Sequence, residues 1–199
     1  MKMKIDFKVG FLVLVASSHL ACVDAWWSKP TRPSVRRPSV RRPPPPRAQP
    51  RCTLQYYKGS EFTKSARVHT GFLSSMHTIN SYAQQCRVRV YITSSYRKTA
   101  HVKGAIVPPA TRSNHMIGHA IDMNLIDRRT GKFCNSRCLP NSSRPNGVSC
   151  FIGKIRSHPT LRWGGDFRRS DPVHIDDATN HRNRALWNQL YNSLQKNCP

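Results

Sequence analysis

Three stretches of the chain place apolar side chains at regular intervals. In residues 66–86 they recur every three or four positions, which predicts an amphipathic helix with Val68, Phe72, Met76, Ile79 and Ala83 on one face. Residues 86–96 alternate instead, with Val88, Val90 and Ile92 set against Arg87, Arg89 and Tyr91, which predicts a strand with one buried face. Residues 178–196 predict a last helix whose apolar face holds Leu186, Trp187, Leu190, Tyr191 and Leu194.

Shorter apolar runs complete the pattern. Residues 119–125 predict a second strand that ends near Asp127, 173–175 a short strand and 151–158 a short helix, while 128–150 is a polar, cysteine-containing loop. Such a mixture of helices and strands indicates the α+β class. Residues 52–199 are expected to form one domain of 148 residues, which is long enough to bury a core.

Residues 1–25 predict a secretory signal peptide. Three lysines precede an apolar run from Val9 to about Ala21, and Val23-Asp24-Ala25 has the small-x-small form of a cleavage site. The alternative is a buried N-terminal helix. No other long apolar run follows, so we expect a secreted, extracellular protein without a transmembrane segment.

Seven cysteines are present, and Cys22 belongs to the predicted signal peptide. An even set of six in an exported chain predicts disulfides, for which fifteen pairings are possible. A zinc knuckle on Cys134 and Cys138 is the alternative. Asn141-Ser142-Ser143 is a sequon for glycosylation if the export route is eukaryotic.

The formal net charge of +24 predicts a polyanionic partner. Residues 26–51 contain eight prolines, eight basic residues and no acidic residue, and 32–36 repeats as 37–41. This composition predicts an extended or disordered arm that is either a spacer or a polyanion-binding segment, and it resembles proline- and arginine-rich antimicrobial peptides. Residues 52–199 alone carry 22 basic and 7 acidic residues, a net charge of +15. Export makes nucleic acid an unexpected partner and anionic cell-wall polymers an expected one.

Asp122 is the first candidate for chemistry, because it lies between Ile121 and Met123 inside a predicted strand. A buried carboxylate without a partner costs several kcal/mol, so either an arginine or a metal ion is expected beside it. His115 precedes it by seven residues, and His174 follows Asp171 by three. Two histidines and one aspartate with a fourth position left for water form a typical catalytic zinc site. Core hydrogen bonds between His and Asp side chains are the alternative reading.

The residues around these candidates form three blocks that resemble the M15-type zinc peptidases, which include D-Ala-D-Ala carboxypeptidases and L-alanyl-D-glutamate endopeptidases. The blocks are Ser113, His115, Gly118, Ala120 and Asp122, then Trp163-Gly164-Gly165-Asp166, then Asp171 and His174. The resemblance spans about residues 65–178. It implies a Hedgehog/DD-peptidase-like fold, with a small antiparallel sheet and flanking helices. It also implies one Zn²⁺ per chain on His115, Asp122 and His174, with Asp171 as general base.

Further roles follow from the same resemblance. Arg97, at the end of the 86–96 strand, would polarise the scissile carbonyl or hold a substrate carboxylate, and Ser113 and Trp163 would line the substrate pocket. Asp166 would fix the glycine turn and His119 would face away from the metal. Asp176, Asp177 and His181 are expected to be surface or capping residues. No glutamine follows Arg97 where the family often has one, and both the cysteine-rich loop and the basic arm differ from bacterial members.

The leading hypothesis is therefore a secreted, monomeric zinc peptidase that cuts peptidoglycan stem peptides. The chain lacks H-E-x-x-H, G-x-S-x-G and P-loop motifs. Two alternatives remain open. One is a non-catalytic, zinc-containing wall-binding protein, since Hedgehog domains resemble this fold. The other is a cationic antimicrobial protein whose arm kills while the domain targets.

Overall fold

The computed structural model describes residues 51–102, 107–108 and 110–199. The described residues all belong to one compact unit, Arg47–Pro199. The predicted signal peptide and all but the last residue of the predicted arm lie outside the described residues. Within the described part, no helix is both long and apolar enough to cross a membrane.

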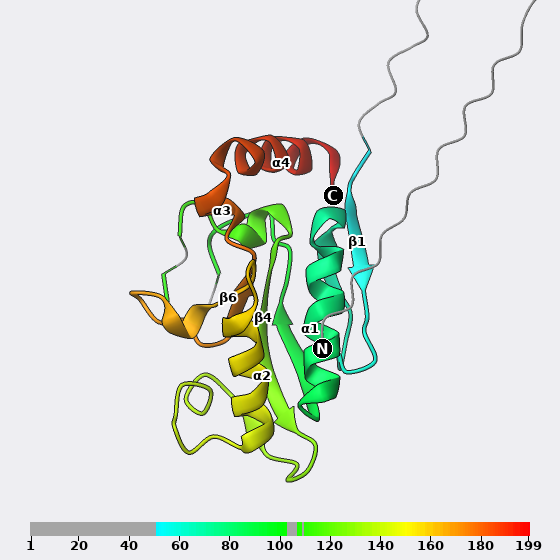
Figure 1. Ribbon diagram of the computed structural model, residues 1–199. Helices are drawn as coiled ribbons and strands as arrows, with labels where there is room; N and C mark the ends of the chain where they lie inside the picture. Colours follow the sequence, from blue (N-terminus) through cyan, green and yellow to red (C-terminus); the bar gives the residue numbers. More distant parts are fainter. Residues whose placement is uncertain (1–50, 103–106, 109) are drawn as a thin grey trace, which may run out of the picture. The chain divides into compact units, whose positions relative to one another are not determined.

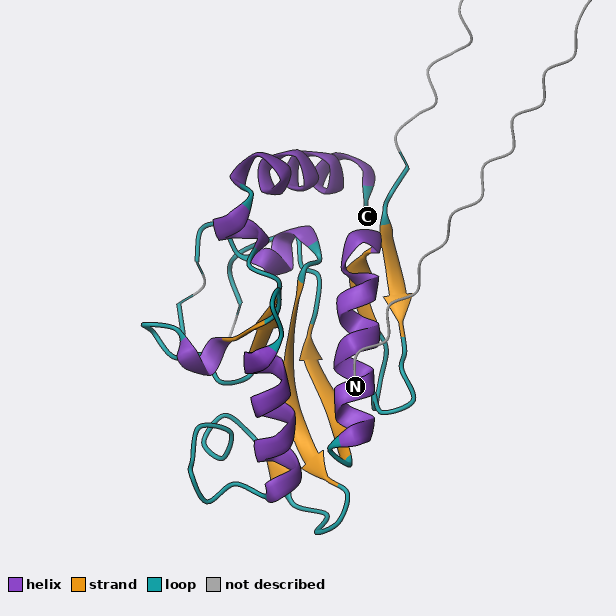
Figure 2. Cartoon of the chain, in the orientation of Figure 1, coloured by secondary structure: helices purple, strands orange, loops and turns teal. Residues whose placement is uncertain are grey.

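The domain is built on an antiparallel sheet in the order β3–β4–β7–β6 (Figures 1 and 2). These strands span Val88–Ser94 (β3), Ala120–Asp127 (β4), His174–Asp176 (β7) and Arg162–Trp163 (β6), and β5 (Phe133–Cys134) also pairs with β4. A separate antiparallel pair joins β1 (Leu54–Tyr57) to β2 (Ala66–His69). The helices are α1 (Leu73–Gln85), α2 (Asn146–Ser157), α3 (Thr179–Arg182) and α4 (Arg184–Asn197). The predicted α+β class with a small antiparallel sheet and flanking helices is confirmed.

Helices α1 and α2 cover one face of the sheet and leave the other open. The covered face carries the apolar residues of β3 and β4, which join Met76 and Ile79 of α1 and Phe151 and Ile155 of α2 in one buried cluster. The alternation predicted for 86–96 is confirmed, because β3 buries every second residue. The open face receives the remaining side chains of β4, including Asp122. Because successive side chains of a strand point to opposite faces, β4 places its core residues on one face and the candidate ligand Asp122 on the other.

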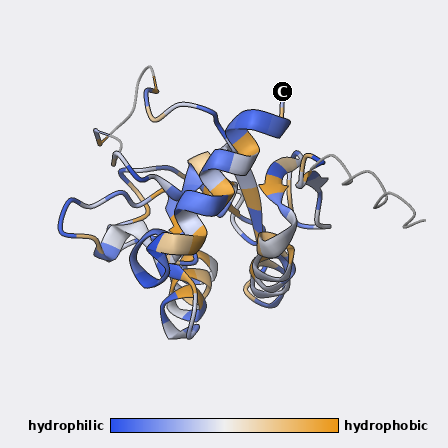
Figure 3. Ribbon diagram, turned by 90° about the horizontal axis from the view of Figure 1, so that it is seen from above, coloured by the Kyte–Doolittle hydropathy of each residue, from blue (hydrophilic) through white to orange (hydrophobic). Residues whose placement is uncertain are grey.

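A second buried cluster lies under α4. Met116 and Ile117 of the 3₁₀-helix η2 (Asn114–Ile117) pack there against Trp187 and Leu194. Figure 3 shows α4, which leads to the C-terminus, as mainly hydrophilic with interspersed hydrophobic residues. Leu186, predicted for the apolar face, is exposed instead. Since η2 also carries His115, the packing of α4 helps to hold a candidate ligand in place.

Two predicted helices have different bounds in the structure. The helix predicted over 66–86 begins only at Leu73, because 66–69 pairs with β1 as strand β2. The helix predicted over 178–196 is divided at Asn183, whose side chain accepts a hydrogen bond from the Leu186 N–H and caps α4. The helix predicted from 151 begins at Asn146, inside the segment that was predicted to be a loop.

The six cysteines of the domain form three disulfides, Cys52–Cys198, Cys86–Cys150 and Cys134–Cys138. The predicted disulfide framework is confirmed. The alternative of a zinc knuckle on Cys134 and Cys138 is wrong, because these two sulfurs are bonded to each other. Asn141 lies exposed in the adjacent turn, where its side-chain oxygen accepts hydrogen bonds from Ser143.

Candidate metal centre

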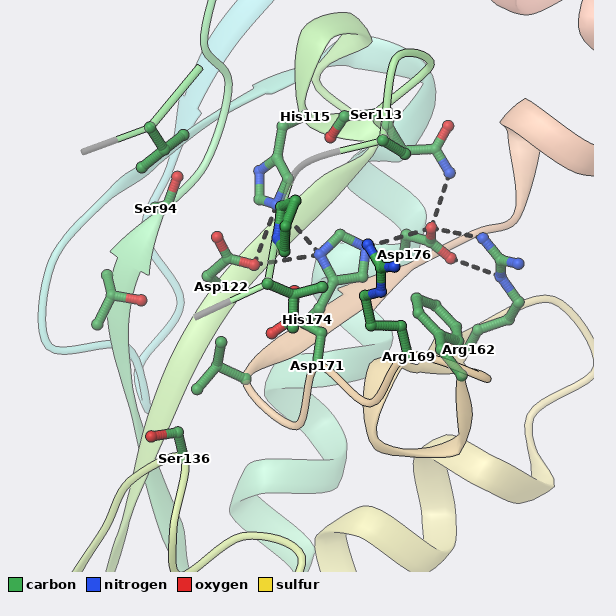
Figure 4. Close-up of a pocket in the computed structure, with 18 of the residues that line it drawn as sticks. Ser94, Ser113, His115, Asp122, Ser136, Arg162, Arg169, Asp171, His174 and Asp176 are labelled. Carbon is green, nitrogen blue, oxygen red and sulfur yellow. Dashed lines mark hydrogen bonds and ion pairs between the residues drawn. The ribbon is translucent and has the colours of Figure 1, made fainter. Parts of the chain in front are cut away.

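The candidate ligands come from two paired strands and one short helix. Asp122 of β4 and His174 of β7 are direct cross-strand partners, so their side chains lie on the same open face. His115 returns to that face from η2 because Gly118 ends η2 in the left-handed conformation, with φ of 68°. Figure 4 shows the three side chains directed toward one another.

The three facing atoms form a nearly equilateral triangle. His115 Nε2 lies 3.0 Å from Asp122 Oδ1 and 3.1 Å from His174 Nδ1, and His174 Nδ1 lies 3.1 Å from the same carboxylate oxygen. Nitrogen and oxygen ligands at the corners of a tetrahedron around zinc are separated by about 3.3 Å, given bonds of about 2.0 Å. The triangle therefore has nearly the size that such an ion requires.

Hydrogen bonds behind the two imidazoles indicate where their protons lie. His115 Nδ1 is 2.7 Å from the carbonyl oxygen of Ser95, and His174 Nε2 is 3.2 Å from Asp176 Oδ2. Both partners only accept, so each of these nitrogens donates, and in the neutral imidazole the opposite nitrogen presents a lone pair to the triangle. Two imidazole lone pairs and a carboxylate oxygen at this distance repel one another unless a cation lies between them. The donor set therefore fits a metal ion.

The pKa shifts of Asp122 and His174 also indicate that the cluster stabilises a positive charge at its centre. Burial alone would raise the pKa of Asp122, but the charge and hydrogen bonds of His115, followed by those of His174, hold it well below its usual range. Burial would lower the pKa of His174, yet hydrogen bonds to Asp122 and Asp176 raise it to about 9. A proton on an imidazole thus takes the place that a metal ion would otherwise fill, and metal and protons compete for this cluster.

Asp176 holds His174 in place from behind. Its carboxylate is 2 % exposed and accepts two hydrogen bonds from Arg162, at 2.8 and 2.7 Å, and one from Asn114 Nδ2 at 2.9 Å. Burial opposes its ionisation, but the hydrogen bonds from His174 and Arg162 keep its pKa below the usual range. The expectation that Asp176 is a surface residue is wrong, although its Oδ1 also accepts the Ala178 N–H at the start of α3, at 3.1 Å. The spacing of two from His174 was the missed signal, since it puts both side chains on one face of a strand.

Asp171 and Arg97 line the same cavity as the cluster. Burial, followed by the nearby charge of Asp122, raises the pKa of Asp171 above its ordinary value. Arg97 Nη1 lies 3.8 Å from Asp122 Oδ2 and Nη2 donates weakly to Ser113 Oγ at 3.4 Å, while its Nε is buried without a partner among the described residues. Burial lowers the pKa of Arg97. Its guanidinium therefore has donors left for a ligand.

The cavity has a volume of about 1030 Å³. Ser113 lines it, as predicted from the resemblance, and so does the exposed His181 of α3. Residues of β3, β4 and the 135–136 segment form the wall on the side of the sheet: Thr93, Ser94, Asn124, Asn135 and Ser136. The cavity is thus polar along the sheet and open enough for an extended peptide.

Other predicted residues lie elsewhere. Trp163 is buried in the core, where its Nε1 donates to the Pro172 carbonyl at 2.7 Å, and it is not among the residues that line the described cavity. Asp166, the last residue of the turn Gly164–Asp166, forms a two-fold hydrogen-bonded ion pair with Arg156 of α2. His119 points away from the metal cluster and contacts Asp177 and His69, at 2.6 and 3.0 Å. Arg97 lies three residues beyond the end of β3.

A family model described as D-alanyl-D-alanine carboxypeptidase matches residues 108–177. The match confirms the resemblance to M15-type peptidases. The M15-type segment contains all three candidate ligands and Asp171, whereas Arg97 precedes it. A peptidase that acts on peptidoglycan is the activity this family indicates. No curated protein matches the chain significantly.

Proposed function

We propose that this chain is a secreted zinc-dependent peptidase that hydrolyses amide bonds in the stem peptides of bacterial peptidoglycan. The observation that supports it most directly is the triangle of His115, Asp122 and His174, with lone pairs directed inward and a basic carboxylate beside it. A protein that only binds peptidoglycan has no use for a proton acceptor at that point. The peptidase family match supports the same reaction class.

Each remaining residue has a defined task in this reaction. Zinc, when bound by the three ligands, would lower the pKa of a coordinated water to about 7 and polarise the scissile carbonyl. Asp171, which lines the cavity beside the cluster, accepts the proton of the attacking water and delivers it to the departing amine as the carbon–nitrogen bond breaks. Arg97 stabilises the negative charge that develops on the carbonyl oxygen or holds a substrate carboxylate.

Metal analysis combined with product analysis tests the proposal. The full chain is stripped with a chelator, reloaded with zinc, and incubated with a defined stem pentapeptide, and the products are identified by mass spectrometry. We expect one zinc per chain and zinc-dependent release of a new amine. The masses of the products distinguish removal of the terminal D-Ala from cleavage inside the stem.

The Asp171→Asn variant separates catalysis from binding. We expect it to keep its zinc and lose about 10²- to 10⁴-fold in kcat, because it removes only the proton acceptor. Asp166→Asn is the matched control, since that carboxylate pairs with Arg156 outside the cavity. If the zinc-loaded wild type binds peptidoglycan but releases no amine from any stem peptide, the non-catalytic binding protein is the correct reading.

A further inference from the structure

Two neighbouring arginines line the cavity without any assigned task. Arg168 and Arg169 are both exposed, and neither forms an ion pair or a side-chain hydrogen bond within the described part of the chain. The other arginines of the cavity differ in this respect. Arg162 is held by Asp176, and Arg97 lies beside Asp122. Among the described residues, Arg168 and Arg169 are therefore the cavity's unneutralised cations.

The loop that carries these arginines is held at both ends. The N–H groups of Phe167 and Asp171 both donate to the Gly164 carbonyl, at 3.1 and 2.8 Å, and Ser170 Oγ donates to the Gly165 carbonyl at 3.2 Å. The guanidinium of Arg162 lies 4.8 Å from the centre of the Phe167 ring. The same closed turn thus ends at Asp171, so the arginines have a fixed relation to the proposed proton acceptor.

Figure 4 shows Arg169 extending from this loop toward the cluster, so that it overlies His174 in this view. Because Arg168 and Arg169 line the same cavity as the cluster, on a restrained loop, they can contact a part of the substrate that extends away from the reacting amide. Two guanidinium groups there favour a carboxylate, which they bind through paired N–H···O bonds. Little loop ordering has to accompany binding, which favours affinity.

We propose that Arg168 and Arg169 form a subsite for a substrate carboxylate near the scissile amide, separate from any group held by Arg97. This inference rests on the proposed function and adds a substrate preference to it. The stem peptide supplies such carboxylates at its glutamyl residue and, where present, at diaminopimelate. A stem amidated at the recognised position is then a poor substrate.

Matched peptides test the subsite. Two pairs of stem peptides are used with the zinc-loaded full chain: one pair is free or amidated at the glutamyl α-carboxyl, the other at the side-chain carboxyl of diaminopimelate. For at least one pair, we expect wild-type kcat/KM to be about tenfold higher for the free acid, as for one charge-assisted contact of about 1.4 kcal/mol. In the Arg168→Gln/Arg169→Gln double variant the ratio falls to within about twofold of unity, because the free acid loses its advantage.

The control is Arg89→Gln/Arg184→Gln, which removes the same charge from two exposed positions outside the cavity. It should keep the wild-type ratio. No discrimination by the wild type, or a ratio that survives in the Arg168/Arg169 variant, overturns the subsite while the proposed peptidase stands. Reduced adsorption of that variant to cell walls with an unchanged ratio also overturns it, and assigns the arginines to polymer binding.

Binding measurements keep the inference testable if no peptide is cleaved. Titration calorimetry compares the dissociation constants of the free and amidated peptides. Tighter binding of the free acid to the wild type, lost in the double variant, establishes the subsite even though the peptidase proposal has failed. Equal dissociation constants for both forms overturn the subsite independently of catalysis.

Discussion

At the scale of single residues, the two histidines of the cluster present different nitrogens to one point. His115 uses Nε2 because its Nδ1 donates to the Ser95 carbonyl, and His174 uses Nδ1 because its Nε2 donates to Asp176. The ligand motif can be read from the sequence, since the residue types and their spacing are local. The choice of nitrogen cannot, because both acceptors depend on how distant segments pack. For the same reason Asn114 and Arg162, which fix Asp176, were missed.

The first prediction concerns Asp176 as a positioning residue. Asp176→Asn retains an oxygen for His174 but loses the charge that makes this imidazole a strong ligand. We expect zinc affinity to fall about 10- to 100-fold, as is usual when the carboxylate behind a metal-bound histidine is removed. A competitive chelator titration measures it.

Asp166→Asn is the control for this experiment, because it breaks a similar two-fold arginine pair at an exposed site. Its zinc affinity should stay at the wild-type value. Equal zinc affinities for Asp176→Asn and the wild type contradict the positioning role, even if Asp176→Asn unfolds at a lower temperature.

The second prediction concerns His69, which caps η1 (Thr70–Phe72) by accepting the Gly71 N–H at 3.0 Å. Burial, followed by the charge of His119, lowers its pKa from 6.5 to about 4. The unfolded chain therefore binds more protons between these values, and His69 makes stability fall as pH decreases from about 6.5 to 4. In His69→Asn, which can still cap η1, that fall should be smaller.

Urea unfolding of metal-free protein at pH 7, 5.5 and 4.5 measures this effect, and removing the metal keeps proton competition at the zinc ligands out of the comparison. His101→Asn, at an exposed position, serves as the control and should follow the wild type. Parallel pH profiles for His69→Asn and the wild type contradict the assignment.

At the scale of helices and strands, the spacing of apolar residues predicted those elements whose conformation depends on one buried face. The predictions of β3 and of the strand around Asp122 are confirmed. Each of these strands buries one face, and the buried residues lie in one cluster with residues of α1 and α2. The start of α1 was missed because residues 66–69 extend to pair with β1, a partner that helical spacing does not reveal. The division between α3 and α4 follows from a capping side chain at Asn183, inside an otherwise continuous helical pattern.

The third prediction concerns the turn that connects η2 to β4. Gly118 has φ of 68°, and a Cβ there would approach the His69 nitrogen to 2.6 Å. Gly118→Ala should therefore cost more than about 1 kcal/mol in unfolding free energy and weaken zinc binding, because η2 carries His115. Gly153→Ala is the contrasting control, since it has open space in α2 and should gain about 0.5–1 kcal/mol. Unchanged stability and zinc affinity in Gly118→Ala contradict this role for the turn.

At the scale of the whole molecule, adsorption through the basic surface can be separated from the proposed zinc-dependent cleavage. The domain of residues 52–199 carries a net charge of +15, whereas the candidate metal ligands are largely buried, with His115 1 % exposed. Adsorption to anionic walls should therefore fall steeply as salt is raised from about 50 to about 500 mM. Over the same range, zinc-dependent cleavage of a small peptide with blocked, uncharged termini should change little. Sedimentation of protein with cell walls and product analysis measure the two properties. A parallel decline in both contradicts their separation.

The three disulfides close loops of very different length, which allows the contribution of chain entropy to be tested. Cys52–Cys198 joins residues 146 positions apart, near the two ends of the domain, whereas Cys134–Cys138 joins residues four positions apart. Loop-closure entropy gives about 5 kcal/mol for the long loop and about 2 kcal/mol for the short one. The sequence left the disulfide pairing open, because the number of cysteines does not show which of them the fold brings close together.

The last prediction follows from this difference. Cys52→Ser/Cys198→Ser should lose clearly more unfolding free energy than Cys134→Ser/Cys138→Ser, measured by urea unfolding of the zinc-loaded proteins. Zinc affinity should also fall in the first variant, because Cys198 packs in the cluster of Met116 and Ile117, next to His115 in η2. The second variant should keep its zinc affinity, since β5 pairs with β4 only at Leu125 and Ile126, beyond Asp122 along that strand. Equal losses in both variants would mean that strain or residual structure, and not loop length, decides how these bridges stabilise the domain.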